Sequence, residues 1–205
     1  MASYSIDCII DSFPLSEEKS NNTIKFKVLG PPSLQTKLNK LLQQNITVFS
    51  LEVKITPAIL PPLDLQVEMQ QWDKNENSLP PRVLSANKQL AVHEMVYKLL
   101  RLKVIRASQA HRYSQVTLVP KTDSSWRMCI DYRRLNRITN GLGWPLPNIV
   151  EMLRRIGQNK PKFFATMDLT SGYHQMPMSA SSIKYTAFIT FMGVFEWLRY
   201  EYPWV

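Results

Sequence analysis

The sequence has only two cysteines, Cys8 and Cys129, and no apolar run approaching the roughly 18 residues that a membrane helix needs. Two cysteines cannot make a disulfide framework, and neither has neighbours at the spacing of a zinc site. The first residues also lack the basic and apolar regions of a secretory signal. These absences exclude a disulfide-rich secreted protein, a zinc finger and a membrane span, and they predict an intracellular protein with no membrane partner.

Arginine is absent from the first 81 residues and frequent after them. Residues 1–79 carry seven lysines against nine acidic residues, a net charge of −2, whereas residues 80–205 carry 18 basic against seven acidic residues, a net charge of +11. The arginine fork matches phosphate oxygens, and a surplus of this size attracts polyanions. The imbalance favours a nucleic-acid or nucleotide partner, and a solvated charged surface is the alternative that the composition leaves open.

The composition also changes near residue 80, where we place the boundary of the main domain. Five prolines in residues 57–81 disfavour helix and predict an extended linker. Before this linker, leucines at helical spacing predict one amphipathic helix over about 33–46, with Ser33 at its N-cap. Residues 1–80 are therefore interpreted as a mostly irregular N-terminal connector with one helix.

Helical and strand patterns are interleaved after residue 80, which predicts an α+β domain. Apolar residues at helical spacing predict one helix from Ser85 to about Lys103 and another from Pro145 to Gly157. Alternating residues predict a hairpin of strands 115–120 and 126–131. Further strands are expected at residues 163–168, 185–190 and 194–199, the last two forming a second hairpin.

An apolar run that ends in a carboxylate is the most informative stretch of the chain. Residues 163–167 lead to Asp168, and a Ser-Gly turn comes after it at residues 171–172. A carboxylate at the end of a strand, beside free backbone amides, can hold a hard cation and face a phosphate. Capping of the next short helix is the alternative interpretation, and it is the more common role of a single strand-end aspartate.

Two basic residues stand at neighbouring ends of the first predicted hairpin. Lys121 follows the first strand, and Arg127 lies near the start of the second. Two cations at one end of a hairpin are suited to gripping a triphosphate. Taken singly, each residue is also compatible with a solvated surface charge.

Five motifs in one order connect these residues to a known family. They are Val-Pro-Lys-x-Asp-x-x-Trp-Arg-Met-Cys-Ile-Asp-Tyr-Arg-x-Leu-Asn (119–136), Trp-Pro-Leu-Pro (144–147), Met-Asp-Leu-Thr-Ser-Gly-Tyr-His-Gln (167–175), Tyr-Thr-Ala-Phe (185–188) and Phe-Glu-Trp (195–197). Together they resemble the reverse transcriptase of gypsy-type long-terminal-repeat retrotransposons. Residues 34–81 are similar, more weakly, to the connector that precedes the polymerase in such polyproteins.

The resemblance implies a truncated right-hand polymerase fold. Fingers would be built from about 82–163 and the first part of the palm from about 163–198, so that the main domain is 82–198. Asp168 would be the first metal-binding carboxylate, and the Leu169 backbone carbonyl would assist it in holding Mg²⁺. Such enzymes use two Mg²⁺ ions to neutralise charge during phosphoryl transfer.

The resemblance also implies how a nucleotide is held. Lys121 and Arg127 would grip the incoming triphosphate, and Tyr173 would lie under the deoxyribose and discriminate against a 2′-hydroxyl. Gln175 would lie near the primer–nucleotide pocket. The implied partners are an RNA or DNA template–primer and deoxynucleoside triphosphates.

The sequence departs from the family pattern after the last motif. The chain has no Asp-Asp pair for the family's Tyr-x-Asp-Asp hairpin, and Glu196 and Glu201 are the acidic residues after Asp168. The family's Pro-x-Gly segment is replaced by a divergent tail over 199–205. We therefore interpret the chain as a truncated gene product and predict that it does not polymerise DNA on its own.

Two other classes of function stay open at this point. A non-catalytic nucleic-acid-binding remnant would hold template through phosphate contacts, with stacking by Trp126 and Tyr132 as an option, although packing is the favoured role of both rings. A protein-interaction or structural fragment would use the charge only for solubility. The sequence also leaves the oligomeric state open.

Overall fold

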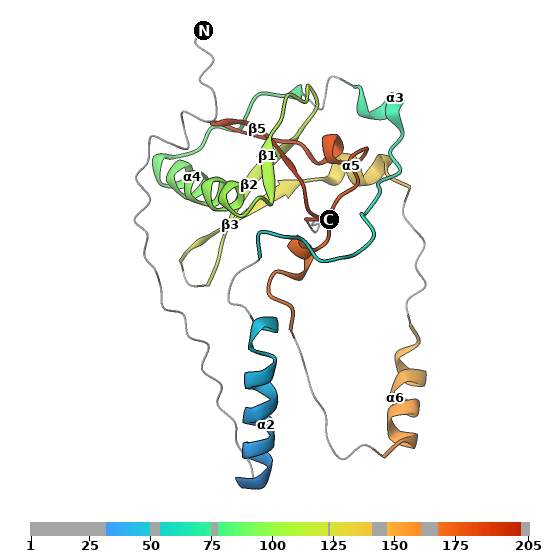
Figure 1. Cartoon of the computed structure of the whole chain (residues 1–205). Helices are drawn as coiled ribbons and strands as arrows, with labels where there is room; N and C mark the ends of the chain where they lie inside the picture. Colours follow the sequence, from blue (N-terminus) through green and yellow to red (C-terminus); the bar gives the residue numbers. More distant parts are fainter. Residues whose placement is uncertain are drawn as a thin grey trace.

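The computed structural model describes residues 32–49, 54–74, 78–122, 124–140, 147–160 and 168–201. The described residues form a five-stranded sheet with the order β1-β5-β4-β2-β3 (Figure 1). The strands are β1 (Ile105–Ala107), β2 (Ser114–Pro120), β3 (Trp126–Asp131), β4 (Phe188–Thr190) and β5 (Gly193–Trp197). Neighbouring strands are antiparallel except for β2 and β4, which are parallel.

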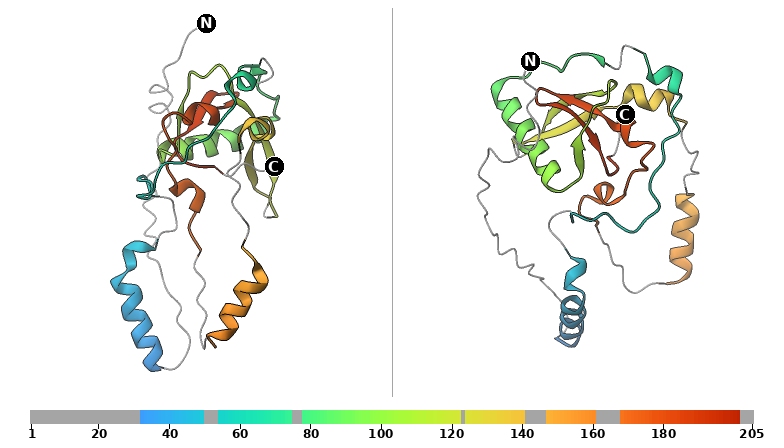
Figure 2. Two further views of the ribbon diagram at one scale, coloured as in Figure 1. Left: turned by 90° about the vertical axis from the view of Figure 1, so that its right-hand side faces the viewer. Right: turned by 45° about the horizontal axis from the view of Figure 1, so that its top comes forward.

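The helices divide into those that pack on the sheet and those that stand away from it. They are α2 (Pro32–Gln44), α3 (Met69–Trp72), α4 (Ala86–Arg101), α5 (Arg133–Ile138) and α6 (Ile149–Gln158), with 3-10 turns η1 (Ile46–Val48), η3 (Gly172–Gln175) and η4 (Ile183–Thr186). Helices α2 and α6 extend away from the sheet in both views of Figure 2, and neither has a buried residue. Within the described ranges, no helix combines the length and the apolar character needed to cross a bilayer.

The first predicted hairpin is confirmed, and its alternation explains how it covers the core. Strands β2 and β3 pair antiparallel from Gln115–Asp131 to Pro120–Trp126. Ile130 is buried, and Trp126 and Met128 pack against the core, whereas Arg127 on the opposite face is exposed. Side chains of a strand alternate between its two faces, so one face of the hairpin is free for polar contacts.

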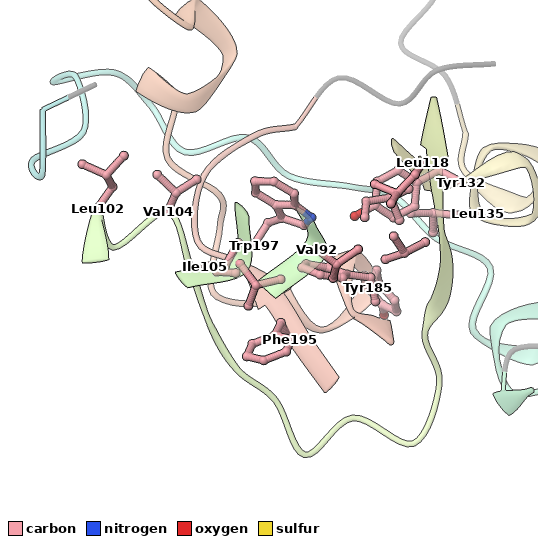
Figure 3. Packing of buried hydrophobic residues seen from close by; sticks show 14 of the residues in the cluster. Val92, Leu102, Val104, Ile105, Leu118, Tyr132, Leu135, Tyr185, Phe195 and Trp197 are labelled. Carbon is pink, nitrogen blue, oxygen red and sulfur yellow. The ribbon is translucent and has the colours of Figure 1, made fainter. Parts of the chain in front are cut away.

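Helix α4 and the sheet enclose the hydrophobic core. The cluster, most of which Figure 3 shows, joins residues of α4, of all five strands and of the segments between them. Val92 and Val96 of α4 are fully buried, as their helical spacing predicts. Ser85 is the N-cap residue of this helix, but its side chain makes no capping hydrogen bond.

Two predicted boundaries differ from the structure for local reasons. Helix α6 begins at Ile149 rather than at Pro145, because the Asn148 side chain accepts a hydrogen bond from the Glu151 N–H and caps the helix there. The helix also continues one residue past Gly157. The strand expected at 163–168 lies outside the described residues except for Asp168.

The second hairpin is shorter than its predicted strands. Residues 185 and 186 belong to the turn η4, so that β4 starts only at Phe188, and β5 ends at Trp197. The Thr186 hydroxyl donates to the Ile183 carbonyl at 2.6 Å and accepts from the Trp197 N–H at 2.9 Å. These bonds hold the turn against β5, which is why the residues before Phe188 do not extend the strand.

Part of the predicted connector packs on the main domain. Two isolated bridges join residues 54–74 to it, Leu63 with Met178 and Val67 with Thr139. The Asp64 carboxylate accepts hydrogen bonds from Ser179, Ser181 and Ser182 at 2.5, 2.9 and 2.8 Å. Trp72, at the end of α3, is buried in the core. The domain boundary near residue 80 stays a prediction, but residues 54–74 are structurally tied to the main domain.

Arg199 opens the segment predicted to diverge, and it is buried. Its side chain is among the largest fully buried ones, with 2% of the residue exposed. The guanidinium donates to the carbonyls of Lys54 at 2.7 Å, His174 at 3.3 Å and Leu102 at 3.4 Å, and to that of Ile55. Burial lowers the pKa of Arg199. The residue therefore fastens the end of β5 to segments from distant parts of the chain.

Candidate nucleotide-binding site

A cavity of about 690 Å³ lies where α4, the β2–β3 hairpin and the turn η3 meet. Its lining combines basic residues, aromatic and apolar side chains, and the turn residues: Met95, Lys98, Leu99, Lys121, Trp126, Arg127, Met128, Ser171, Tyr173, His174, Trp197 and Glu201. A concave site with an apolar body and a few charged groups is the usual form of a small-molecule pocket. This cavity is therefore the candidate site.

The hairpin register places the two predicted phosphate-binding cations on one face. Arg127 pairs directly with Val119, and Lys121 follows Val119 by two residues. Cross-strand partners and residues two apart share a face of the sheet, so Lys121 and Arg127 are diagonal neighbours. The loop is closed by a hydrogen bond from the Lys121 N–H to the Ser125 carbonyl at 2.8 Å. Both side chains are exposed and line the cavity.

The turn η3 brings Tyr173 to the same cavity. Ser171, its N-cap, has a left-handed backbone with φ of 44°. At Gly172 an added Cβ would lie 3.2 Å from the Leu169 Cβ, so a larger residue would crowd the turn. The Tyr173 ring is half exposed and meets the Tyr200 ring edge to face, with centroids 5.8 Å apart. The left-handed Ser171 and the small Gly172 shape the turn that places Tyr173 in the wall of the cavity.

The remaining predicted site residues do not line this cavity. Asp168 and Leu169 are exposed, and neither belongs to the cavity wall. The Gln175 side chain donates to the Thr170 carbonyl at 2.9 Å, so it stabilises the turn. The structure thus brings Lys121, Arg127 and Tyr173 to one cavity, and the roles of all six residues stay predictions.

The donor groups near Asp168 do not form a complete magnesium site. Among the described residues, no group of three or more His, Cys, Asp or Glu side chains could hold a metal ion. Of the later acids, Glu196 accepts hydrogen bonds from Arg106 at 2.7 Å and Ser108 at 2.6 Å, and Glu201 is paired with His174. Mg²⁺ is usually bound by one or two carboxylates together with substrate phosphates, so Asp168 and the Leu169 carbonyl alone are a weak set of ligands.

The pKa values of Cys129, which is partly buried, and of Tyr132, which is buried, reflect the charges near the hairpin. Burial raises the pKa of the Cys129 thiol, with Arg127 acting to lower it and Glu201 to raise it. Burial also raises the pKa of Tyr132 well above its ordinary value, and Glu201 adds to that effect. The Tyr132 hydroxyl donates to the Thr186 carbonyl at 2.8 Å, and its ring is in the core. The packing role predicted for Tyr132 is therefore confirmed.

A second basic pocket was not predicted from the sequence. This cavity of about 370 Å³ is lined by four arginines, Arg82, Arg133, Arg134 and Arg137, with Asp131 among them. Hydrogen bonds from Arg133, together with the charges of Arg133 and Arg82, lower the pKa of Asp131 to about 2 against the opposing effect of its burial. The signal in the sequence is the clustering of three arginines within residues 133–137.

Comparison with known proteins assigns these features to a class. Residues 119–202 match the family described as reverse transcriptase (RNA-dependent DNA polymerase). A foamy viral protease–reverse transcriptase, solved in complex with an RNA/DNA hybrid, superposes with a TM-score of 0.68 at 19% identity, over 87% of this chain and 24% of that one. The described α+β fold is therefore part of a polymerase fold of the reverse transcriptase type.

Sequence relatives narrow the class to a family. The Pol polyprotein of transposon 297 from Drosophila melanogaster is 39% identical over 121 residues, which is 57% of this chain and 11% of that polyprotein. Those of transposon 412 and transposon gypsy, from the same organism, are 28% and 36% identical over 90% and 53% of this chain. Over the region that they share, the chain resembles the reverse transcriptases of retrotransposon Pol polyproteins, as the motifs predicted, and it spans 11–15% of the length of these three relatives.

Proposed function

We propose that this chain is the nucleotide- and template-binding part of an RNA-directed DNA polymerase, and that by itself it binds polyanions without extending a primer. The observation that carries this proposal is the cavity that Lys121, Arg127 and Tyr173 line together. The net charge of +11 on residues 80–205 supports it. So do the similar foamy viral protease–reverse transcriptases, which were solved in complex with double-stranded DNA and with an RNA/DNA hybrid.

Different residues of the cavity contact different parts of a deoxynucleoside triphosphate. Lys121 and Arg127 oppose the phosphate charge, and the Arg127 fork is suited to two oxygens at once. The half-exposed Tyr173 ring supplies a flat surface under the sugar and excludes a 2′-hydroxyl by its bulk. Phosphoryl transfer depends mainly on such positioning and charge neutralisation. Asp168, the Leu169 carbonyl and Gln175 are assigned to the neighbouring reacting end.

Lack of polymerase activity is expected from the acids that are available. When two Mg²⁺ ions are bound, they supply charge neutralisation at the reacting phosphate, and they need at least one further carboxylate beside Asp168. Glu196 and Glu201 are the acids after Asp168, and both are already paired with other side chains. No acidic side chain after Asp168 is therefore free to complete a two-metal centre.

Primer extension with the purified 205-residue chain tests this proposal. We expect salt-dependent binding of a fluorescent RNA/DNA template–primer, with anisotropy falling as salt rises, because phosphate contacts release counterions. We expect no extended product with Mg²⁺ and all four deoxynucleoside triphosphates. Product that depends on Mg²⁺ would contradict the predicted inactivity, and the absence of binding at low salt would contradict the proposed function.

A non-catalytic nucleic-acid-binding remnant is the second candidate, and the arginine pocket favours it. Arg134 and Arg137 lie in a cavity separate from the one that holds Lys121. A remnant would lose template binding when these arginines are replaced by glutamine, and its template binding would not change with Lys121→Gln. A nucleotide-binding polymerase segment would instead lose triphosphate binding with Lys121→Gln.

A further inference from the structure

A carboxylate lines the same cavity as the phosphate-binding cations. Glu201 belongs to its wall together with Lys98, Lys121 and Arg127. It comes from the segment that departs from the family pattern, whose other described charged residue, Arg199, points into the protein. A negative charge in a pocket for a polyphosphate opposes the ligand it is built to receive.

The Glu201 side chain is held in place on the wall. Its carboxylate pairs with the His174 Nε2, and the two side chains are only 24% and 21% exposed. The His174 ring stacks on the Trp197 indole with centroids 5.4 Å apart and an interplanar angle of 25°. The His174 carbonyl also accepts a hydrogen bond from Arg199 at 3.3 Å. These contacts hold the Glu201 carboxylate through His174 on the wall that also carries the cations.

The charge of Glu201 reaches the hairpin strand that carries Arg127. Cys129 follows Arg127 by two residues and lies on the same face of β3. Arg127 and Glu201 act on the Cys129 thiol with opposite sign. The thiol thus lies within the field of both charges, and it provides a reporter that needs no ligand.

We propose that Glu201 is an internal anion of the nucleotide pocket and that its charge weakens the binding of a triphosphate there. This inference rests on the proposed function, because it assumes that Lys121 and Arg127 receive phosphate. Its consequence is that the pocket of this chain holds polyphosphate less tightly than its three cations would allow.

Neutralising Glu201 without changing its shape tests the inference. The Glu201→Gln variant keeps a hydrogen bond to His174 and removes the charge, and Glu201→Asp keeps the charge. Binding of inorganic tripolyphosphate and of a deoxynucleoside triphosphate is measured by calorimetry with the full chain. We expect Glu201→Gln to bind about five- to tenfold more tightly at low salt, with the gain shrinking as ionic strength rises.

Matched variants separate the effect of position from that of total charge. Glu151→Gln makes the same charge change on α6, where Glu151 pairs with Arg154 and Arg155 outside the cavity, so it should leave affinity unchanged. Glu201→Asp should stay near the unmodified chain. Lys121→Gln should weaken binding by about the same factor by which Glu201→Gln strengthens it.

Alkylation of Cys129 gives a readout that is independent of phosphate binding. In a Cys8→Ser background, Glu201→Gln should lower the thiol pKa and speed alkylation at fixed pH, whereas Glu151→Gln should not. If Lys121→Gln weakens binding and Glu201→Gln changes neither affinity nor alkylation, the inference is wrong and the proposed function stands. If no variant binds either polyphosphate at low salt, the proposed function fails and the inference fails with it.

Discussion

At the scale of single residues, pairing decides what each charge can do. The Asp131 carboxylate is 18% exposed and accepts hydrogen bonds from Arg133 at 2.7 and 2.8 Å and from Arg82 at 3.3 Å. Two guanidinium groups are thereby held at the rim of the arginine pocket. The remaining arginines of the pocket, Arg134 and Arg137, are exposed on α5. The pocket therefore keeps a net positive charge.

This pairing predicts a pH-dependent stability. The pKa of Asp131 is about 2 in the folded chain against an ordinary 3.8, so its contribution is complete above about pH 4 and is lost as pH falls through 2. The contribution is on the order of 1–2 kcal/mol, because partly exposed pairs are screened by solvent.

Urea unfolding of the unmodified chain and of Asp131→Asn at several pH values measures it. The difference in unfolding free energy should be present at pH 5 to 7 and should shrink toward pH 2. A difference that stays constant over that range would show that Asp131 contributes through shape rather than charge.

At the scale of elements, signals carried by neighbouring residues predicted the structure well. The alternation in residues 126–131 is local, and the hairpin it predicts is present with the expected faces. Strand β1 and helix α5 were missed because three and six residues are too few to show a period. Helix α6 was predicted, but its apolar residues are exposed. Amphipathic spacing predicts that a helix has an apolar face, but it does not predict which surface covers that face.

The contrast between α4 and α6 gives a matched prediction. Val96 of α4 is fully buried, whereas Val150 of α6 is 76% exposed. Val96→Ala should lower the free energy of unfolding by about 2 kcal/mol through lost burial and a cavity. Val150→Ala should change it by less than about 0.5 kcal/mol. Chemical denaturation of both variants checks this, and equal losses would place α6 against the core.

The candidate site could be predicted in part for the same reason. Lys121 and Arg127 belong to one local hairpin, so their shared face is set by the register. Tyr173 joins them through the tertiary fold, and the family resemblance rather than any local pattern pointed to it. Glu201 was missed as a wall residue because its place depends on how the chain turns after β5, which no nearby residue encodes.

At the scale of the whole molecule, residues 54–74 are joined to the main domain by polar contacts as well as by the buried Trp72. The Asp64 carboxylate accepts hydrogen bonds from three serine hydroxyls. These bonds lower the pKa of Asp64, and the bond from Ser179 has the largest effect. Next to it, the Leu65 N–H donates to the Ser182 hydroxyl at 2.7 Å, and Ser182 is fully buried. The polar contacts join two segments more than a hundred residues apart in sequence.

Removing the Asp64 carboxylate should therefore loosen residues 54–74 without unfolding the sheet. In Asp64→Ala, hydrogen exchange at Leu65 should become faster, because Ser182 loses the partner that orients its hydroxyl. Amides of β2 and β3 should keep their protection. Exchange measured by NMR or mass spectrometry distinguishes this from general destabilisation, in which both regions would lose protection together.

The parallel pairing of β2 with β4 sets the order in which the molecule can form. Ser114 pairs with Phe188, 74 positions later, whereas the β2–β3 hairpin closes over a five-residue loop. Closing the long connection costs more chain entropy and waits until its far end exists. During synthesis on the ribosome, the hairpin that carries Lys121 and Arg127 can thus form early, and its β2 edge stays unpaired until residues 188–190 have emerged.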